Sequence, residues 1–134
     1  MVENWIVPCN IKYYDVVKHL NENDYIVWRR VSAIRKGDIV YLYIALPYQE
    51  IKFRCLVVDD DVDEKTVENN SYAIKTSSSG KKSHYILLKK EYAYKEGTFR
   101  LAELKANGLG QTQTQARTDR KLQAFIDSVN ETIK

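Results

Sequence analysis

Residues that commonly carry out catalysis are few in this sequence, and none of them falls into a recognisable catalytic motif. The two histidines, His19 and His84, have no serine or cysteine nearby in a nucleophile motif, and the five glycines do not form a phosphate-binding loop. Three consecutive carboxylates, Asp59, Asp60 and Asp61, follow an expected strand and alternate in direction, which predicts a solvated turn rather than a metal site. We therefore expect a binding module that is not an enzyme and that uses no metal and no cofactor.

A stacking surface and a hydrogen-bonding amide are the chemistry that the sequence does offer. Trp28 lies in a run of strand-forming residues, and Asn10 precedes a run with helical periodicity. An aromatic ring offers a flat apolar surface, and an asparagine amide can both donate and accept hydrogen bonds. The alternatives are structural: Trp28 as a core aromatic residue and Asn10 as a helix N-cap. The pocket hypothesis requires the two side chains to converge.

Composition predicts one domain, covering residues 1–134. Tyrosine is the unusual residue, with 10 copies against 3 phenylalanines and 2 tryptophans, and its apolar ring with a polar tip suits half-buried pockets. A net charge of +3 does not by itself identify a nucleic-acid-binding protein. Cys9 and Cys55 lack metal-ligand spacing and predict buried, reduced thiols. With no signal peptide and no apolar run of membrane length, we expect a cytoplasmic protein without a membrane partner.

Strands in the N-terminal half are predicted at residues 5–7, 25–30, 39–44 and 51–58. The run 39–44 is apolar at nearly every position, so we expect both of its faces to be buried. A tight turn, Gly37-Asp38, precedes it, and we expect Asp38 to order that turn rather than to bind a ligand.

Helices are predicted where apolar residues recur at helical spacing. The first begins with Asn10 as its N-cap, and its apolar face is formed by Tyr13, Val16, Val17 and Leu20. The last begins with Thr118 as its N-cap, and its apolar face is formed by Leu122, Phe125, Ile126 and Val129. Between them we expect a short helix at 65–70, a flexible segment at 71–83, a strand at 85–94 and a helix at 101–107 that ends at Gly108.

The order of these elements argues against a doubly wound parallel sheet, because strands and helices do not alternate regularly. The tally of five or six strands and three or four helices predicts an α+β fold. We expect a curved mixed sheet or small barrel, largely closed so that few edges are exposed, with helices packed outside.

The N-terminal half, residues 4–58, resembles the EVE domain family of the PUA-like superfamily and, more distantly, YTH domains. The resemblance is carried by the order of the motifs: Trp5-Ile6-Val7-Pro8-Cys9-Asn10 before a helix, Trp28 in a strand, then Lys36-Gly37-Asp38 and the apolar strand. It implies a curved sheet with a rim pocket that receives a flipped, often modified, nucleobase. The chain departs from the usual EVE pattern in Arg29-Arg30-Val31 after Trp28 and in the absence of a histidine near Tyr43.

The resemblance implies a role for several residues. Trp28 matches a stacking tryptophan, and Asn10 matches a polar residue that hydrogen-bonds the base. Tyr14 flanks the entrance, as does Tyr13. The candidates for a second wall are Trp5, Tyr43 and Tyr48. The candidates for phosphate contacts are Arg29, Arg30, Arg54 and Arg117. We expect these arginines to form one basic surface on which DNA or RNA lies.

Two other functions stay open at this point. A hydrolase of the ASCH-like type, also in the PUA-like superfamily, would need reactive side chains at the rim, such as Lys36 with Tyr41. A peptide-binding domain would use the same aromatic residues as a docking patch. Cleavage of RNA without a metal would favour the hydrolase, and arginines scattered over opposite faces would favour the peptide-binding domain.

Overall fold

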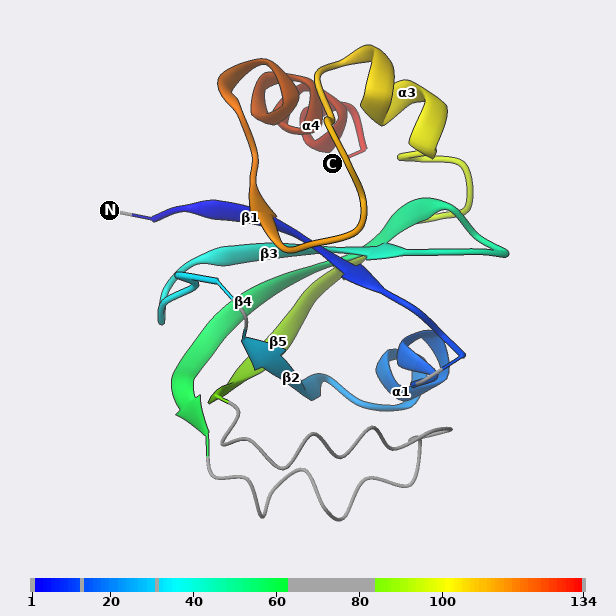
Figure 1. Ribbon diagram of the computed structural model, residues 1–134. Helices are drawn as coiled ribbons and strands as arrows, with labels where there is room; N and C mark the ends of the chain where they lie inside the picture. The colour runs from blue at the N-terminus through cyan, green and yellow to red at the C-terminus, as the bar shows by residue number, and fades with distance from the viewer. Residues whose placement is uncertain (1, 13, 31, 63–83, 134) are drawn as a thin grey trace.

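Six strands and the helices packed on them make up the described part of the chain. The structure is a computed structural model, and it describes residues 2–12, 14–30, 32–62 and 84–133. The strands are β1 (Asn4–Cys9), β2 (Tyr25–Arg30), β3 (Ile39–Ile44), β4 (Glu50–Val62), β5 (His84–Ala93) and β6 (Ala116–Arg117). The helices are α1 (Val16–Glu22), α3 (Leu101–Ala106) and α4 (Arg120–Thr132) (Figure 1).

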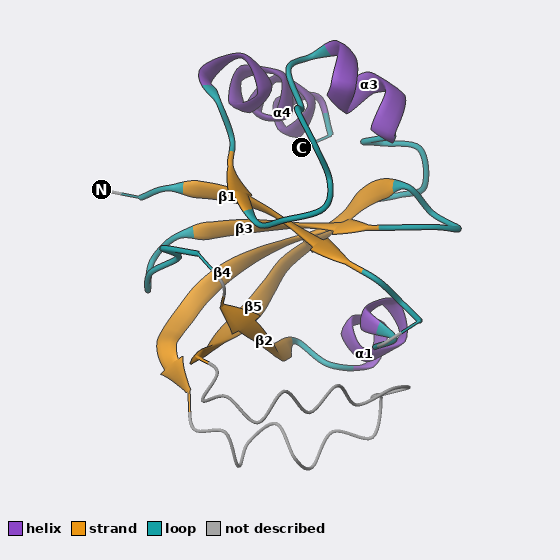
Figure 2. Ribbon diagram, viewed as in Figure 1, coloured by secondary structure: helices purple, strands orange, loops and turns teal. Residues whose placement is uncertain are grey.

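The strands form one mixed sheet in the order β2-β5-β4-β3-β1-β6. β1 pairs with β3 in parallel, and every other neighbouring pair is antiparallel. The sheet curves strongly, and the long strands β4 and β5 bend around the end that carries α1 (Figure 2). This confirms the predicted α+β class and the curved mixed sheet. The expectation of a largely closed sheet is corrected: β2 and β6 are the two edges of the sheet and do not pair with each other.

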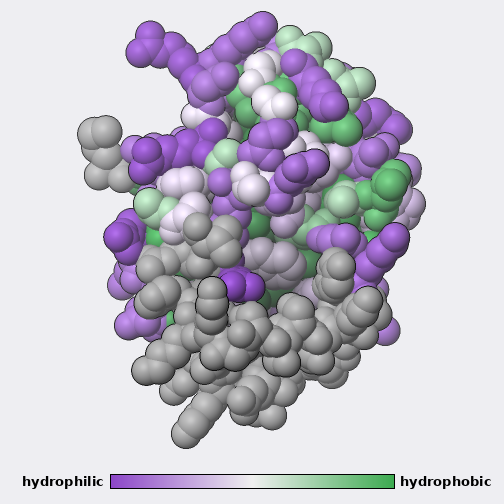
Figure 3. Space-filling model, viewed as in Figure 1, coloured by the Kyte–Doolittle hydropathy of each residue, from purple (hydrophilic) through white to green (hydrophobic). Residues whose placement is uncertain are grey.

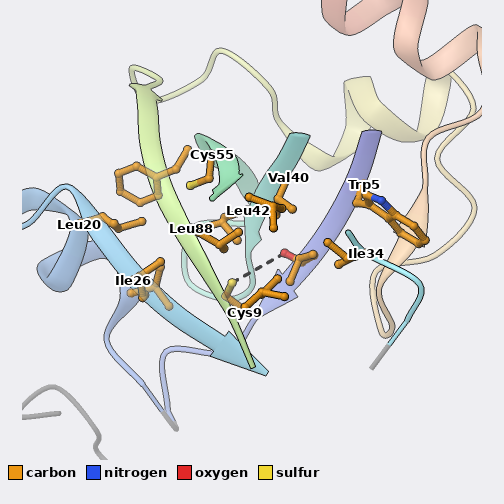
Figure 4. Packing of buried hydrophobic residues seen from close by; sticks show 14 of the residues in the cluster. Trp5, Cys9, Leu20, Ile26, Ile34, Val40, Leu42, Cys55 and Leu88 are labelled. Carbon is orange, nitrogen blue, oxygen red and sulfur yellow. Dashed lines mark hydrogen bonds between the residues drawn. The ribbon is translucent and has the colours of Figure 1, made fainter. Parts of the chain in front are cut away.

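Two hydrophobic clusters lie on the two faces of this sheet. On the α1 face, alternate residues of β3, Val40, Leu42 and Ile44, pack with Val16 and Leu20 of α1. Figure 4 shows this cluster, with Leu20 and Ile26 at one end and Trp5 beside Ile34 at the other. On the α4 face, the other residues of β3 pack beneath α3 and α4. All six residues of β3 are therefore buried, as the unbroken apolar run predicts.

The apolar face of the last helix, α4, packs as its sequence pattern predicts. Leu122 and Ile126 are buried, and Phe125 and Val129 pack beside them, which confirms the predicted apolar face of α4. Its N-cap is Asp119, whose side chain accepts from the backbone N–H of Leu122; the predicted cap, Thr118, lies one residue earlier.

The first helix begins later than predicted. Its N-cap is Asp15, whose carboxylate accepts from the backbone N–H of Lys18 at 3.1 Å. The side chain of Asn10 instead accepts from the backbone N–H of Lys12 at 2.9 Å, which forms a local turn. Asn10 as an N-cap is therefore wrong. The physical reason is that an aspartate closer to the apolar stripe satisfies the helix terminus, while the asparagine satisfies its own turn.

The turn before β3 forms as predicted. Gly37 has φ of 94°, a conformation that residues with a Cβ rarely adopt. Asp38 is buried, and its carboxylate accepts hydrogen bonds from the backbone N–H groups of Glu3 and Arg35 and from the indole of Trp5. These bonds hold the start of β1 against the turn, so the structural role predicted for Asp38 is confirmed.

Several predictions concern segments that the structure places differently or does not describe. The predicted helix at 65–70 and the segment 71–83 lie outside the described residues, as does Tyr13. Asp59, Asp60 and Asp61 lie inside the long strand β4 rather than in a turn. Glycine ends α3 as predicted: Gly108 has φ of 110° and follows the C-cap residue.

The surface is mostly polar in the view of Figure 3, with apolar atoms gathered at the edge where the turn between β3 and β4 projects. Leu46, in that turn, is 66% exposed. Among the described residues, none of the helices combines the length and the apolar character needed to cross a membrane.

Candidate functional site

Trp28 lies half-buried at the α1 face and is packed against the hydrophobic cluster there. The ring of Tyr14 meets it edge-on, with centroids 5.9 Å apart and planes at 82°. This is a preferred geometry for two aromatic rings. Tyr14 itself is only partly buried, so the pair forms an aromatic corner that is not sealed inside the core.

The orientation of Tyr14 is set by His19 on α1. The hydroxyl of Tyr14 lies 2.6 Å from Nδ1 of His19, and Nε2 of His19 lies 2.7 Å from the backbone carbonyl of Tyr25. A carbonyl only accepts, so Nε2 of a neutral imidazole carries the proton and Nδ1 accepts from the tyrosine hydroxyl. His19 therefore positions the ring of Tyr14. Sequence reasoning missed this role because it considered His19 only as a catalytic residue. The sequence feature that could reveal this role is the position of His19 in the first predicted helix, five residues after Tyr14.

Asn10 follows β1 and is exposed. Its Oδ1 is occupied by the backbone N–H of Lys12, whereas its Nδ2 makes no hydrogen bond within the described part of the chain. The amide therefore keeps its donors for a ligand.

The three candidates for a second wall, Trp5, Tyr43 and Tyr48, lie in different surroundings.

Trp5 is a core residue, only 4% exposed. Its indole N–H donates to Asp38 at 2.9 Å, and the guanidinium of Arg117 lies over its ring at 5.0 Å from the centroid. Arg117 also reaches the carboxylate of Glu3 at 3.8 Å. The ring is thus already enclosed, and it anchors β1, the Gly37-Asp38 turn and β6 to one another.

Tyr43 does not share a face with Trp28. It is buried in the cluster beneath α4, because successive residues of β3 point to opposite faces. Burial raises the pKa of its phenol. Tyr48 lies in the exposed turn between β3 and β4, where Lys52 sits over its ring at 4.6 Å. The two tyrosines therefore do not form one wall. The prediction that Tyr43 and Trp28 line a single pocket is wrong, because the two side chains lie on opposite faces of the sheet.

The described arginines that were predicted to bind phosphate lie on three different strands. Arg29 is exposed on the edge strand β2, and Arg117 is exposed on the opposite edge strand β6. Arg54 lies on β4 at the α4 face, where its Nε donates to Glu91 at 3.2 Å. The side chain of Arg30 lies outside the described part. The described arginines therefore do not form the single surface predicted for them.

A side chain that sequence reasoning missed, Gln115, brings the two sheet edges together. Its Nε2 donates to the backbone carbonyl of Arg29 at 2.8 Å, and its Oε1 accepts from the hydroxyl of Ser32 at 2.7 Å. Gln115 immediately precedes β6, so it links β6 to the end of β2. This seam places Arg29 and Arg117 on two strands joined by one side chain.

Features needed for the hydrolytic alternative do not converge where they were expected. Tyr41 is 1% exposed beneath α4, and its hydroxyl lies 3.4 Å from Nε2 of Gln123. Lys36 is exposed in the turn before β3. Among the residues that the structure describes, His, Cys, Asp and Glu form no group of three that could hold a metal ion. Burial raises the pKa of the thiols of Cys9 and Cys55, so both are protonated at neutral pH.

Comparison with known proteins identifies the fold. No protein-family model matches the sequence, and no curated protein matches it significantly. The solved ASCH protein from Zymomonas mobilis is similar with a TM-score of 0.61 at 9% identity, over 94% of this chain and 94% of that chain. The DUF55 domain of human thymocyte nuclear protein 1 is similar with a TM-score of 0.61 at 17% identity, over 96% of this chain and 98% of that chain.

The chain has a PUA-like fold. A hypothetical protein from Leishmania major shares it with a TM-score of 0.67 at 15% identity, over 100% of this chain and 98% of that chain. These likenesses extend over nearly the whole chain, whereas the sequence resemblance lies mainly in residues 4–58, with a loose counterpart at 113–125. The PUA-like fold that the resemblance implies is confirmed, and membership of the EVE family stays a prediction.

Proposed function

We propose that this PUA-like domain is a non-catalytic nucleic-acid-binding module of the EVE type, which holds an unpaired, flipped nucleobase against Trp28. The base stacks in the corner between Trp28 and Tyr14, and the free amide donors of Asn10 reach its edge. A modified base is the preferred occupant, because a damaged or altered base is extruded from a duplex at lower cost.

The observation that carries the proposal is the half-buried corner formed by Trp28 and Tyr14. Most large apolar side chains on this face are buried in the core. The rings of Trp28 and Tyr14 pack against that core on one side and are partly exposed on the other. The hydrogen bond to His19 fixes Tyr14 before any ligand arrives. A preorganised ring loses little freedom on binding, so more of the stacking free energy contributes to affinity.

The charges at the seam supply the sequence-independent part of binding. Arg29 follows Trp28 directly on β2, and Arg117 lies across the seam that Gln115 bridges. Both side chains are exposed, so they can contact phosphates on either side of a flipped nucleotide. The affinity should therefore fall as the salt concentration rises.

The test is a titration of single-stranded RNA and DNA oligonucleotides, with and without a methylated adenine or cytosine, followed by calorimetry. Trp28→Ala should lower the affinity by about tenfold to a hundredfold, equivalent to about 1–3 kcal/mol, while the domain keeps its fold by circular dichroism. Tyr14→Phe keeps the ring and loses the bond to His19, so it should weaken binding less than Trp28→Ala.

Tyr25→Ala is the matched control, because this exposed tyrosine lies on the same strand as Trp28, β2, and belongs to neither hydrophobic cluster. A folded Trp28→Ala protein that binds every oligonucleotide as tightly as the parent would refute the assignment. Cleavage of the RNA during the titration would support the hydrolase in its place, and binding of peptides but of no oligonucleotide would support the peptide-binding domain.

A further inference from the structure

A pocket lies on the α4 face, at the C-terminal end of α4. It has a volume of about 300 Å³ and is lined by Arg54, Glu91, Tyr92, Tyr94, Asn130 and Ile133. This volume is at the lower end of the range for ligand pockets, which fits a single flat ring rather than a larger molecule. Trp28 packs on the other face of the sheet, so this pocket is separate from the site proposed above.

An irregularity in the sheet builds one wall of the pocket. Arg54 pairs with Tyr92 and Cys55 pairs with Lys90, so the register passes over Glu91, which is the extra residue of a β-bulge. In a regular strand, Glu91 and Tyr92 would point to opposite faces. The bulge lets both line the same pocket beside Arg54. Bulges that redirect a side chain in this way are common next to functional sites.

The wall offers an exposed aromatic surface with a rigid support. Tyr92 is 42% exposed, and its ring lies 5.0 Å from that of Tyr94. Tyr94 in turn meets Phe99 edge-on at 4.8 Å, and Phe99 meets Phe125 at 6.0 Å. A chain of packed rings therefore connects the exposed ring to the core, which holds the stacking surface in place.

The polar groups around this ring are incompletely paired. Asn130 accepts from the hydroxyl of Tyr94 at 2.7 Å, but its Nδ2 is buried without a hydrogen-bond partner among the described residues. A buried amide donor without a partner is rare, because it costs free energy that a hydrogen-bond acceptor on a ligand would recover. Within the described ranges, Arg54 donates only through its Nε, to one oxygen of Glu91, which leaves its outer nitrogens and the second carboxylate oxygen for a ligand.

We propose that this pocket binds a nucleobase that carries an exocyclic amino group, namely guanine, cytosine or adenine, stacked on Tyr92. The second oxygen of Glu91 accepts from the amino group, and Arg54 and Asn130 donate to the neighbouring carbonyl or ring nitrogen. Arginine with guanine and glutamate with the cytosine amino group are established pairings of these chemical groups. Uracil has no exocyclic amino group, so it lacks the contact to Glu91. The source of the base is either a free nucleotide or an unpaired nucleotide of a longer strand.

The test is isothermal titration calorimetry of the whole chain with the 5′-monophosphates of guanosine, cytidine, adenosine and uridine. At least one of the three amino-bearing nucleotides should bind about fivefold or more tightly than the uridine nucleotide. Tyr92→Ala should weaken that binding by about tenfold to a hundredfold. Glu91→Gln should reduce the preference over uridine, because an amide offers a poorer acceptor than a carboxylate.

Two variants serve as controls. Tyr25→Ala removes an equally exposed tyrosine from β2 and should leave mononucleotide binding unchanged. The two proposals can fail independently, because Tyr92→Ala tests the pocket on the α4 face and Trp28→Ala tests the corner on the α1 face. Failure of all four nucleotides to bind, equal losses in Tyr92→Ala and Tyr25→Ala, or uridine binding as tight as the best of the others would each overturn the proposal. A short single strand that binds through Tyr92 more tightly than any mononucleotide would identify the longer strand as the source.

Discussion

The side-chain amide of Gln115 donates a hydrogen bond of 2.8 Å to the backbone carbonyl of Arg29, across the gap between the two edges of the sheet. The same side chain accepts from Ser32 at 2.7 Å. β6 and β2 are not paired with each other, and this glutamine supplies a side-chain connection between them. The open edge of β2 is thereby partly covered, which limits its pairing with other chains.

Removing this connection should loosen the seam without unfolding the domain. Gln115→Ala loses both hydrogen bonds, and each contributes about 0.5–1.5 kcal/mol, so the free energy of unfolding should fall by about 1–3 kcal/mol. Gln113→Ala is the control, because the side chain of Gln113 is exposed and makes none of these bonds. Urea denaturation gives both values, and hydrogen exchange at β6 should be faster in the first variant alone. Equal stability in the two variants would show that the connection contributes nothing.

The carboxylate of Asp38 should be among the most important polar groups for stability. Asp38→Ala leaves the indole N–H of Trp5 and the backbone N–H groups of Glu3 and Arg35 without their acceptor at a buried position. We expect a loss on the order of 3–5 kcal/mol in the free energy of unfolding. Asp61→Ala, at an exposed position of β4, should change it by about 0.5 kcal/mol or less. Urea denaturation of both variants tests this, and similar values would contradict the role assigned to Asp38.

The two buried thiols should make the fold less stable in alkaline solution. Burial raises the pKa of Cys55 from 9.0 to about 12, with a smaller contribution from the charge of Glu91, and burial also raises the pKa of Cys9. The folded chain therefore keeps protons that the unfolded chain releases above pH 9. This stabilising contribution is complete below the unfolded pKa and is lost as the pH rises toward the folded pKa, at about 1.4 kcal/mol per pH unit for each thiol.

Urea denaturation between pH 8 and pH 10 measures this slope. The double variant Cys9→Ala, Cys55→Ala will be less stable overall because it leaves cavities, but its stability should change less steeply with pH. Parallel pH profiles for the parent and the double variant would exclude the thiols as the cause. The raised pKa of Tyr94 acts in the same direction at higher pH, which is why the comparison stops at pH 10.

The local parts of the fold could be predicted because they depend on neighbouring residues. The apolar run of β3, the glycine at position 37 and the apolar stripe of α4 each follow from the steric and periodic preferences of a few adjacent residues. The helix caps were less certain at this level, because Asn10 and Asp15 both can accept from a helix N-terminus and only one lies in position to do so.

The sequence by itself determined the α+β class and the approximate places of the strands β1 to β5 and of the helices α1, α3 and α4. The tertiary structure alone decided which side chains share a site. Tyr43 faces away from Trp28, Gln115 links β6 to β2, and the bulge at Glu91 lets Glu91 and Tyr92 line one pocket. Each of these depends on strand register and on contacts between residues far apart in the chain, and a shift of one residue moves a side chain to the other face of the sheet.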